Sequence, residues 1–279
     1  MAMPRHQPAR SLAAFAAALA VGSCTGAPPE LGYRLPASPS VVYAYGDTTL
    51  VDVAIMGQSM EIAMRGDADY GVSFATAAPG VEVTLTVDRL DASLTLPMAE
   101  TERLDASEVR GPLVFTLDGE GNATVVSTPE VSMAASRMLS GLTTAHSFFP
   151  GLPDRVVSVG DSWVDSITYE GDAELGAVTE ATVYVYSVVG DTVIDGRPLV
   201  EIRFAGSSST SNSMNMSGMT VAQSSTVELD GHVLWDERAG IMFEMVRRGE
   251  GRGTVRIPMS PQPLPITVRI TQKARLVEG

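Results

Sequence analysis

The sequence has one cysteine, Cys24, together with three histidines and a single lysine in 279 residues. One cysteine leaves no intramolecular disulfide, so core packing alone must hold the fold. The histidines, His6, His146 and His232, lack the short spacing of zinc ligands. No Gly-x-Ser-x-Gly and no His-Glu-x-x-His pattern occurs, so the chain has no recognisable catalytic constellation. We therefore expect a protein that is not an enzyme and holds no cofactor.

Basic residues are scarce, with 19 Lys and Arg against 33 Asp and Glu. Removal of residues 1–23 would take away Arg5 and Arg10 and no acidic residue, which changes the formal charge from −14 by two, to −16. A chain this acidic lacks the basic face that binding to nucleic acid requires. It is also repelled by anionic lipid surfaces. The charge therefore excludes nucleic acid as the main partner.

The sequence begins with a short hydrophobic segment rather than a membrane-spanning one. The apolar run at residues 11–22 follows a basic start and is shorter than the ~20 residues that span a bilayer, which is the pattern of a secretory signal. It ends in Val21, Gly22, Ser23 and Cys24. These four residues resemble the bacterial lipobox. The resemblance implies cleavage before Cys24, a diacylglyceride on its sulfur and an acylated amino terminus.

Such an anchor makes the membrane a partner. The residue after Cys24 is Thr25 and not aspartate, which by analogy with enterobacterial sorting favours the outer membrane, facing the periplasm or the surface. Residues 1–23 are thus expected to be a lipoprotein signal peptide. Residues 24–40, the lipidated cysteine and a stretch rich in Pro, Gly, Ala and Ser, are expected to form a flexible tether.

From Val41 onward the sequence predicts β-strands. Apolar residues alternate with polar ones at residues 81–88, 199–204 and 266–271, as in strands with one buried face. Turn residues separate such runs at 118–122, at Asp195-Gly196, at Asp230-Gly231, at 237–240 and in the glycine-rich stretch 249–253. Residues 41–279 are therefore expected to form one β-rich domain.

One helix is expected between the β-rich stretches. Thr128 can cap it, and Pro129 suits its first position. The apolar residues that follow at helical spacing are Val131, Ala135, Met138, Leu139 and Leu142. The predicted fold class is mainly β, with large curved antiparallel sheets and one central helix. Two arrangements remain open: a half-barrel, or two related halves, 41–128 and 156–279, joined by the helical segment 129–155.

Methionine is the unusual feature of the composition, with fourteen residues. Three of them, Met214, Met216 and Met219, have a spacing that occurs in exported copper-handling proteins, because thioethers are soft ligands for Cu(I). The alternative is that methionines fill irregular gaps or line an adaptable apolar groove. On one continuous strand Met219 would face away from the other two, which favours the apolar interpretation.

Two segments carry a family-level resemblance. The stretch Ile55-Met56-Gly57-Gln58-Ser59-Met60, and Leu152-Pro153 followed by Val159-Gly160-Asp161-Ser162-Trp163, resemble segments of exported β-rich bacterial lipoproteins. That family implies no activity. The expected anchored, curved sheet is also similar in its fold to the half-barrel carriers of the LolA and LppX kind, which hold lipid in an apolar concavity. Three functions follow as hypotheses: carriage of a lipid-like ligand, a structural or interaction module for envelope proteins, and Cu(I) binding.

Overall fold

The computed structural model describes residues 31–279 except 56–57, 79, 98, 133–134, 136–148, 154, 174–175, 217–218, 259, 261 and 279. Most of this part of the chain is β-structure. The strands of its N-terminal part are β1 (Ser40–Ile55), β2 (Gln58–Thr76), β3 (Val81–Thr95), β4 (Glu102–Asp105), β5 (Val109–Arg110), β6 (Leu113–Leu117), β7 (Ala123–Ser127) and β8 (Glu130–Val131). Those of its C-terminal part are β9 (Ser162–Ala173), β10 (Gly176–Ile194), β11 (Arg197–Met216), β12 (Met219–Asp236), β13 (Ile241–Arg256) and β14 (Leu264–Glu278).

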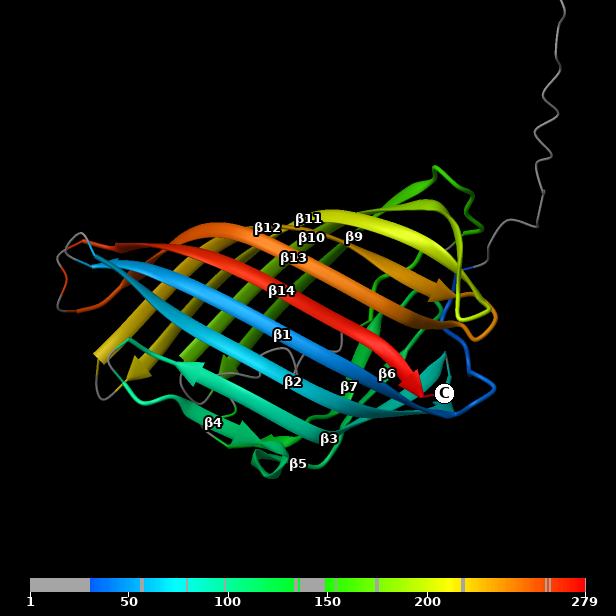
Figure 1. Ribbon diagram of the computed structural model, residues 1–279, viewed down its shortest axis with the longest axis horizontal. Helices are drawn as coiled ribbons and strands as arrows, with labels where there is room; N and C mark the ends of the chain where they lie inside the picture. The colour runs from blue at the N-terminus through cyan, green and yellow to red at the C-terminus, as the bar shows by residue number, and fades with distance from the viewer. Residues whose placement is uncertain are drawn as a thin grey trace, which may run out of the picture.

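Twelve strands form one antiparallel sheet in the order β7-β6-β3-β2-β1-β14-β13-β12-β11-β10-β9, with β4 paired to β3. The expected fold class, mainly β with a large curved antiparallel sheet, is confirmed. Because β1 pairs with β14, the stretches 41–128 and 156–279 both contribute strands to the same sheet. Figure 1 shows this sheet curling, with β1, β2 and β14 crossing the front and β9, β10 and β11 passing behind them.

Alternation along the strands divides the sheet into an inner face, on the side of the core, and an outer face. On β10, Tyr184 and Tyr186 are buried, whereas Val183 and Val185 are exposed. On β11, Val200, Ile202 and Phe204 are buried, as their spacing predicts. The core cluster is built from such inner-face residues of both halves of the sheet, which follows from a strand period of two.

Turns were predicted correctly where the chain reverses over few residues. Asp195 and Gly196 both have positive φ, at 53° and 76°, and they link β10 to β11 in the kind of turn that suits a twisted hairpin. The hairpins β6–β7 and β12–β13 also form as expected. Two other turn predictions were wrong, because Asp230-Gly231 lies within β12 and residues 249–253 lie within β13. Their glycines lie where neighbouring strands approach closely.

The helix expected from Pro129 onward does not begin there. Glu130 and Val131 form strand β8, which pairs with β5 in a separate two-stranded sheet. The rest of the predicted segment, apart from Ser132, Ala135, residues 149–153 and Arg155, lies outside the described residues. Within the described ranges, no helix is long and apolar enough to cross a membrane.

Candidate functional site

The inner face has two ends of different character. At the end where β1 begins and β12 ends, which we call the packed end, the largest side chains are fully buried. Tyr33 lies edge-on to Trp235, with ring centroids 4.9 Å apart, and Phe149 contacts both Tyr33 and Phe115, at 5.8 and 5.5 Å. The aromatic rings pack closely here, and a small cavity of about 190 Å³ lies beside Phe149 and Gly151.

Two segments outside the strands pack at this end: the first contains Tyr33, and the second contains residues 149–152. The backbone N–H of Tyr33 donates to Gly119 O at 3.1 Å, and its hydroxyl donates to Pro150 O at 2.8 Å. The Leu152 N–H donates to Glu120 O, and Trp163 on edge strand β9 donates to Gly151 O. The second segment thereby links the β6–β7 turn to β9. The flexible tether was expected to extend to residue 40, but Leu31 and Tyr33 are buried in the core and therefore belong to the folded domain.

At the opposite end, which we call the open end, the inner face is apolar but only half-buried. The half-buried residues on this part of the inner face include Val51 of β1, Ile62 of β2, Val255 of β13, and Leu264 and Ile270 of β14. Buried neighbours on the same strands, Val53, Ile266 and Val268, extend this surface. Aliphatic side chains that stay partly exposed on the inner side of a curled sheet form a surface suited to an apolar ligand.

Glycines on β13 shape this end. Gly251 and Gly253 take inner-face positions opposite Val268 and Ile266 of β14. A Cβ added to either one would collide with backbone oxygens of β12, at Thr226 and Ser224 respectively. Only residues without a side chain allow β12 and β13 to approach in this way, and glycine commonly marks such bends. The floor of the open end is therefore partly bare backbone.

A row of polar side chains crosses the inner face between the two ends. Arg247, Gln272 and Asp47 are neighbours on β13, β14 and β1. Arg247 Nε donates to Gln272 Oε1 at 2.6 Å, and Gln272 Nε2 donates to Asp47 Oδ2 at 2.5 Å. Arg247 Nη1 also donates to the Tyr184 hydroxyl at 2.8 Å. We call these four residues the polar row.

Burial sets the ionisation of the polar row. It raises the pKa of the Asp47 carboxyl, although hydrogen bonds from Gln272 and Thr49 and the charge of Arg247 oppose the rise. For Arg247, burial acts to lower the pKa, but the neighbouring Tyr184 and Tyr45 outweigh it and the pKa is raised. Burial also raises the pKa of Tyr45. The row therefore holds the Arg247 guanidinium beside the Asp47 carboxyl, and burial favours the neutral forms of that carboxyl and of the Tyr45 phenol.

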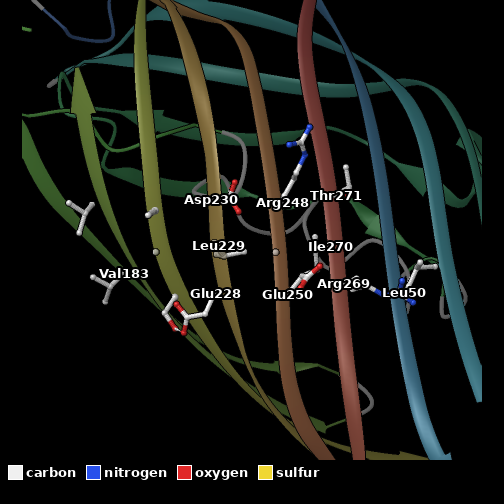
Figure 2. A pocket seen from close by; sticks show the side chains of 15 residues that line it. Leu50, Val183, Glu228, Leu229, Asp230, Arg248, Glu250, Arg269, Ile270 and Thr271 are labelled. Atoms are coloured by element: carbon white, nitrogen blue, oxygen red, sulfur yellow. Dashed lines mark hydrogen bonds between the residues drawn. The ribbon is translucent and has the colours of Figure 1, made fainter. Parts of the chain in front are cut away.

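A second depression lies on the outer face, and we call it the outer hollow. It has a volume of about 930 Å³ and spans β10 to β14 and β1 (Figure 2). Its side chains are mixed: the apolar Val183 and Leu50 stand at its two sides, with charged residues between them (Figure 2). Glu228 lies directly opposite Glu250 across β12 and β13, a like-charge pairing that destabilises a sheet. The outer hollow is thus broad and lined by both apolar and charged residues, whereas the half-buried side chains of the open end are aliphatic.

The residues predicted from sequence as sites fall mostly outside this region. Val21, Gly22, Ser23 and Cys24 lie outside the described residues, as does His146. The side chains of Met214, Met216 and Met219 also lie outside them, but the backbone register pairs Met216 with Met219 across the β11–β12 hairpin. The hairpin therefore does not separate the three residues as one continuous strand would.

His232 lies on the outer face, with Nε2 3.5 Å from Glu244 Oε1. Across the described ranges, no group of three His, Cys, Asp or Glu side chains is placed to hold a metal ion. The polar row was missed from the sequence. No local pattern marked it, because residues 241–245 are all buried without alternation and residues 249–253 were interpreted as a turn.

Comparison with known proteins adds little. No protein-family model matches the chain, and no curated protein matches it. The crystal structure of Pseudomonas aeruginosa OccK5 (OpdH) aligns with 85% of this chain and 98% of its own, at 9% identity and a TM-score of 0.28. That of Pseudomonas aeruginosa OpdO aligns with 87% of this chain and 98% of its own, at 6% identity and a TM-score of 0.20. TM-scores this low carry no argument about fold or function.

Proposed function

We propose that this protein is a non-catalytic lipoprotein, anchored through Cys24 in the outer membrane, whose domain binds a lipid-like hydrophobic ligand at the open end of its inner face. The observation that carries the proposal is the half-buried apolar surface formed by β1, β2, β13 and β14. Exposed apolar area in a soluble domain lowers its stability unless a ligand or partner covers it, at about 25 cal/mol per Å².

The dimensions of this surface suit an acyl chain. From Arg247 to Val255 strand β13 advances by eight residue steps, or about 26 Å at ~3.3 Å per residue. One leaflet of a bilayer supplies about 15 Å of hydrocarbon, half of the ~30 Å core. A single lipid tail would therefore fit along the open end, over the bare backbone of Gly251 and Gly253 and against the aliphatic residues of β14 and β1.

The test uses two adjacent residues of β1 whose side chains lie on opposite faces of the sheet. Val51 is half-buried at the open end, and Leu50 is half-buried in the outer hollow. Native mass spectrometry with lipid extraction, on a soluble chain that begins at residue 31, should find bound lipid in the wild type. Val51→Asp should lower binding of a palmitoyl probe about tenfold or more, because it buries a charge beside the ligand, and Leu50→Asp should not.

Unfolding curves for both variants separate lost binding from lost folding. Ile62→Trp provides a second check, since it fills the open end with an apolar side chain and keeps the surface uncharged. Equal binding by the wild type, Val51→Asp and Ile62→Trp would rule the open end out. A loss confined to Leu50→Asp would move the site to the outer hollow.

The anchor has its own test. Cys24→Ala should abolish metabolic labelling with palmitate and release the protein from the membrane fraction, because three acyl chains hold a protein far more firmly than the reversible hold of one. A variant that still labels and still sediments with membranes would contradict the lipoprotein assignment, whatever the outcome for ligand binding.

An interaction module for envelope proteins is the second candidate. It is favoured by exposed valines on the outer face near edge strand β9, where Val164 lies opposite Val185. Val183 extends this patch into the outer hollow. Val185→Asp should then abolish a crosslink to one defined membrane protein while leaving binding of the palmitoyl probe intact. Retention of the crosslink in Val185→Asp would argue against this surface.

A further inference from the structure

The inner face carries one basic residue among the strand residues that the structure describes, and it is Arg247. The next residue, Arg248, is exposed on the outer face and lines the outer hollow. Arg247 lies where the apolar open end meets the packed end. On one side of it along β13 lie Gly249, Gly251 and Gly253, and on the other side Met245 is buried in the core.

Arg247 is a half-buried cation on the inner face, in the same row as the Asp47 carboxyl. Taking a charged group out of water is unfavourable, and replacing a buried ionic group by apolar residues of similar volume is often neutral or stabilising. The polar row nevertheless positions Arg247 firmly, with the Gln272 amide oxygen on Nε and the Tyr184 hydroxyl on Nη1. A held guanidinium next to a half-buried apolar surface has the arrangement of a binding site for the charged end of an amphiphile.

We propose that the ligand of the open end carries an anionic headgroup, a carboxylate or a phosphate, and that Arg247 and Tyr184 bind it. This inference rests on the proposed function, since it names the chemistry of the ligand at the same site. The headgroup joins the hydrogen-bond network of the polar row, and the tail extends along β13 and β14 toward Val255 and Leu264. Guanidinium binds both kinds of anion strongly because its donors match their paired oxygens.

The packing determines which way round the ligand lies in the site. Beyond the polar row, the packed end is filled by Trp235, Val233 and Tyr43, so no tail can extend in that direction. Toward the turns of β13–β14 and β1–β2 the inner face is apolar and half-buried. The headgroup therefore lies deepest in the site, and the end of the tail lies nearest these turns.

The experiment compares an anionic and a neutral probe of equal tail length. Palmitate and monopalmitoylglycerol are titrated into the soluble chain from residue 31, with binding followed by native mass spectrometry. The wild type should prefer palmitate. Arg247→Gln should weaken palmitate binding about tenfold or more, since a hydrogen bond to a charged group is lost, and should leave monopalmitoylglycerol within about twofold. Arg248→Gln is the matched control and should change neither.

Further variants keep the test decisive if Arg247→Gln folds poorly. Arg247→Lys keeps the charge and should retain part of the preference for palmitate. Tyr184→Phe removes one hydroxyl and should weaken palmitate binding by a smaller factor. A lysophosphatidate probe then distinguishes a phosphate headgroup from a carboxylate, and inorganic phosphate alone tests whether the polar row binds a free anion without a tail.

The outcomes separate the two proposals. If neither palmitate nor monopalmitoylglycerol binds the wild type, the proposed function itself fails. If both bind equally and Arg247→Gln changes neither, the lipid-binding function stands and the headgroup inference is overturned. Equal losses in Arg247→Gln and Arg248→Gln would also overturn it, because the effect would then be one of overall charge.

Discussion

The packed end and the open end of the inner face are built from the same strands but differ in the side chains that these strands carry. At the packed end, aromatic rings from Tyr33, Phe149 and Trp235 fill the space between the two halves of the sheet. At the open end the strands carry aliphatic residues and glycines, and these stay half-buried. The difference indicates that stability is concentrated at the packed end, as expected when stability is uneven across a fold.

The strongest test of this comparison removes one large side chain from each end. Trp235→Ala should lower the free energy of unfolding by about 3–5 kcal/mol, because it leaves a cavity in a close-packed core. Ile62→Ala, at the open end, should lower it by about 1 kcal/mol, since a half-buried side chain loses less burial. Urea unfolding followed by circular dichroism measures both. Equal losses would mean that the open end is as well packed as the other.

The next test concerns the segment that completes the packed end. Tyr33→Ala removes ring contacts with Trp235 and Phe149 and the hydrogen bond to Pro150 O, and should destabilise the domain by about 3 kcal/mol. Tyr33→Phe removes only the hydroxyl and should cost about 1 kcal/mol. If a chain beginning at residue 41 unfolded at the same urea concentration as one beginning at residue 31, this segment would be a tether after all.

A smaller effect is expected at the glycines of β13 at the open end. Gly251→Ala would place a Cβ against Thr226 O and Val227, and overpacking of this kind destabilises by about 1–3 kcal/mol. Gly190→Ala is the matched control, because nothing lies within 4 Å of its Cβ position. It should be neutral or stabilise by up to about 1 kcal/mol through the unfolded chain. Thermal unfolding of the two variants in parallel distinguishes them.

Glycines of this kind also explain why turns were wrongly predicted within β12 and β13. Alternation predicted β3, β6–β7 and β14 because their polar and apolar residues match the two faces of the sheet. Within β12 and β13, Asp230-Gly231 and residues 249–253 have the composition of turns, although they lie in strands where neighbouring backbones approach closely. A Cβ on Gly231 would come within 2.6 Å of Phe204 Cζ. Close approach depends on tertiary packing, which local composition does not encode.

The wrong prediction of a turn at residues 249–253 is also the reason that Arg247 was not recognised as part of a site. Once residues 249–253 are taken as a loop, the alternation of β13 is lost, and nothing distinguishes Arg247 from Arg248. The register of β13 with β14 decides that Arg247 lies beside Gln272 on the inner face. A shift of one residue would exchange the two arginines. The polar row therefore depends on long-range strand pairing, whereas the apolar character of the open end was visible in single strands.

The smallest predicted effect is a pH dependence that compares the polar row with the exposed surface. Burial raises the pKa of Asp47, and hydrogen bonds from the Ser158 backbone and Arg155 lower the pKa of Asp161. Protonated Asp47 thus adds stability below its unfolded pKa of about 3.9, and this is lost as pH rises through its raised folded-state pKa. Asp161 does the reverse: its contribution is present above the unfolded pKa and is lost as pH falls through its lowered folded-state pKa.

Substitution by asparagine isolates each contribution. For Asp47→Asn, the unfolding free energy of the variant minus that of the wild type should rise with pH from about pH 4 and level off above the raised pKa. For Asp161→Asn the same difference should fall as pH rises to about 4 and then stay constant. Urea unfolding across this range measures both. Parallel curves would mean that water reaches Asp47 as freely as Asp161, and the polar row could not then provide the low-dielectric site that strengthens binding of an anionic headgroup.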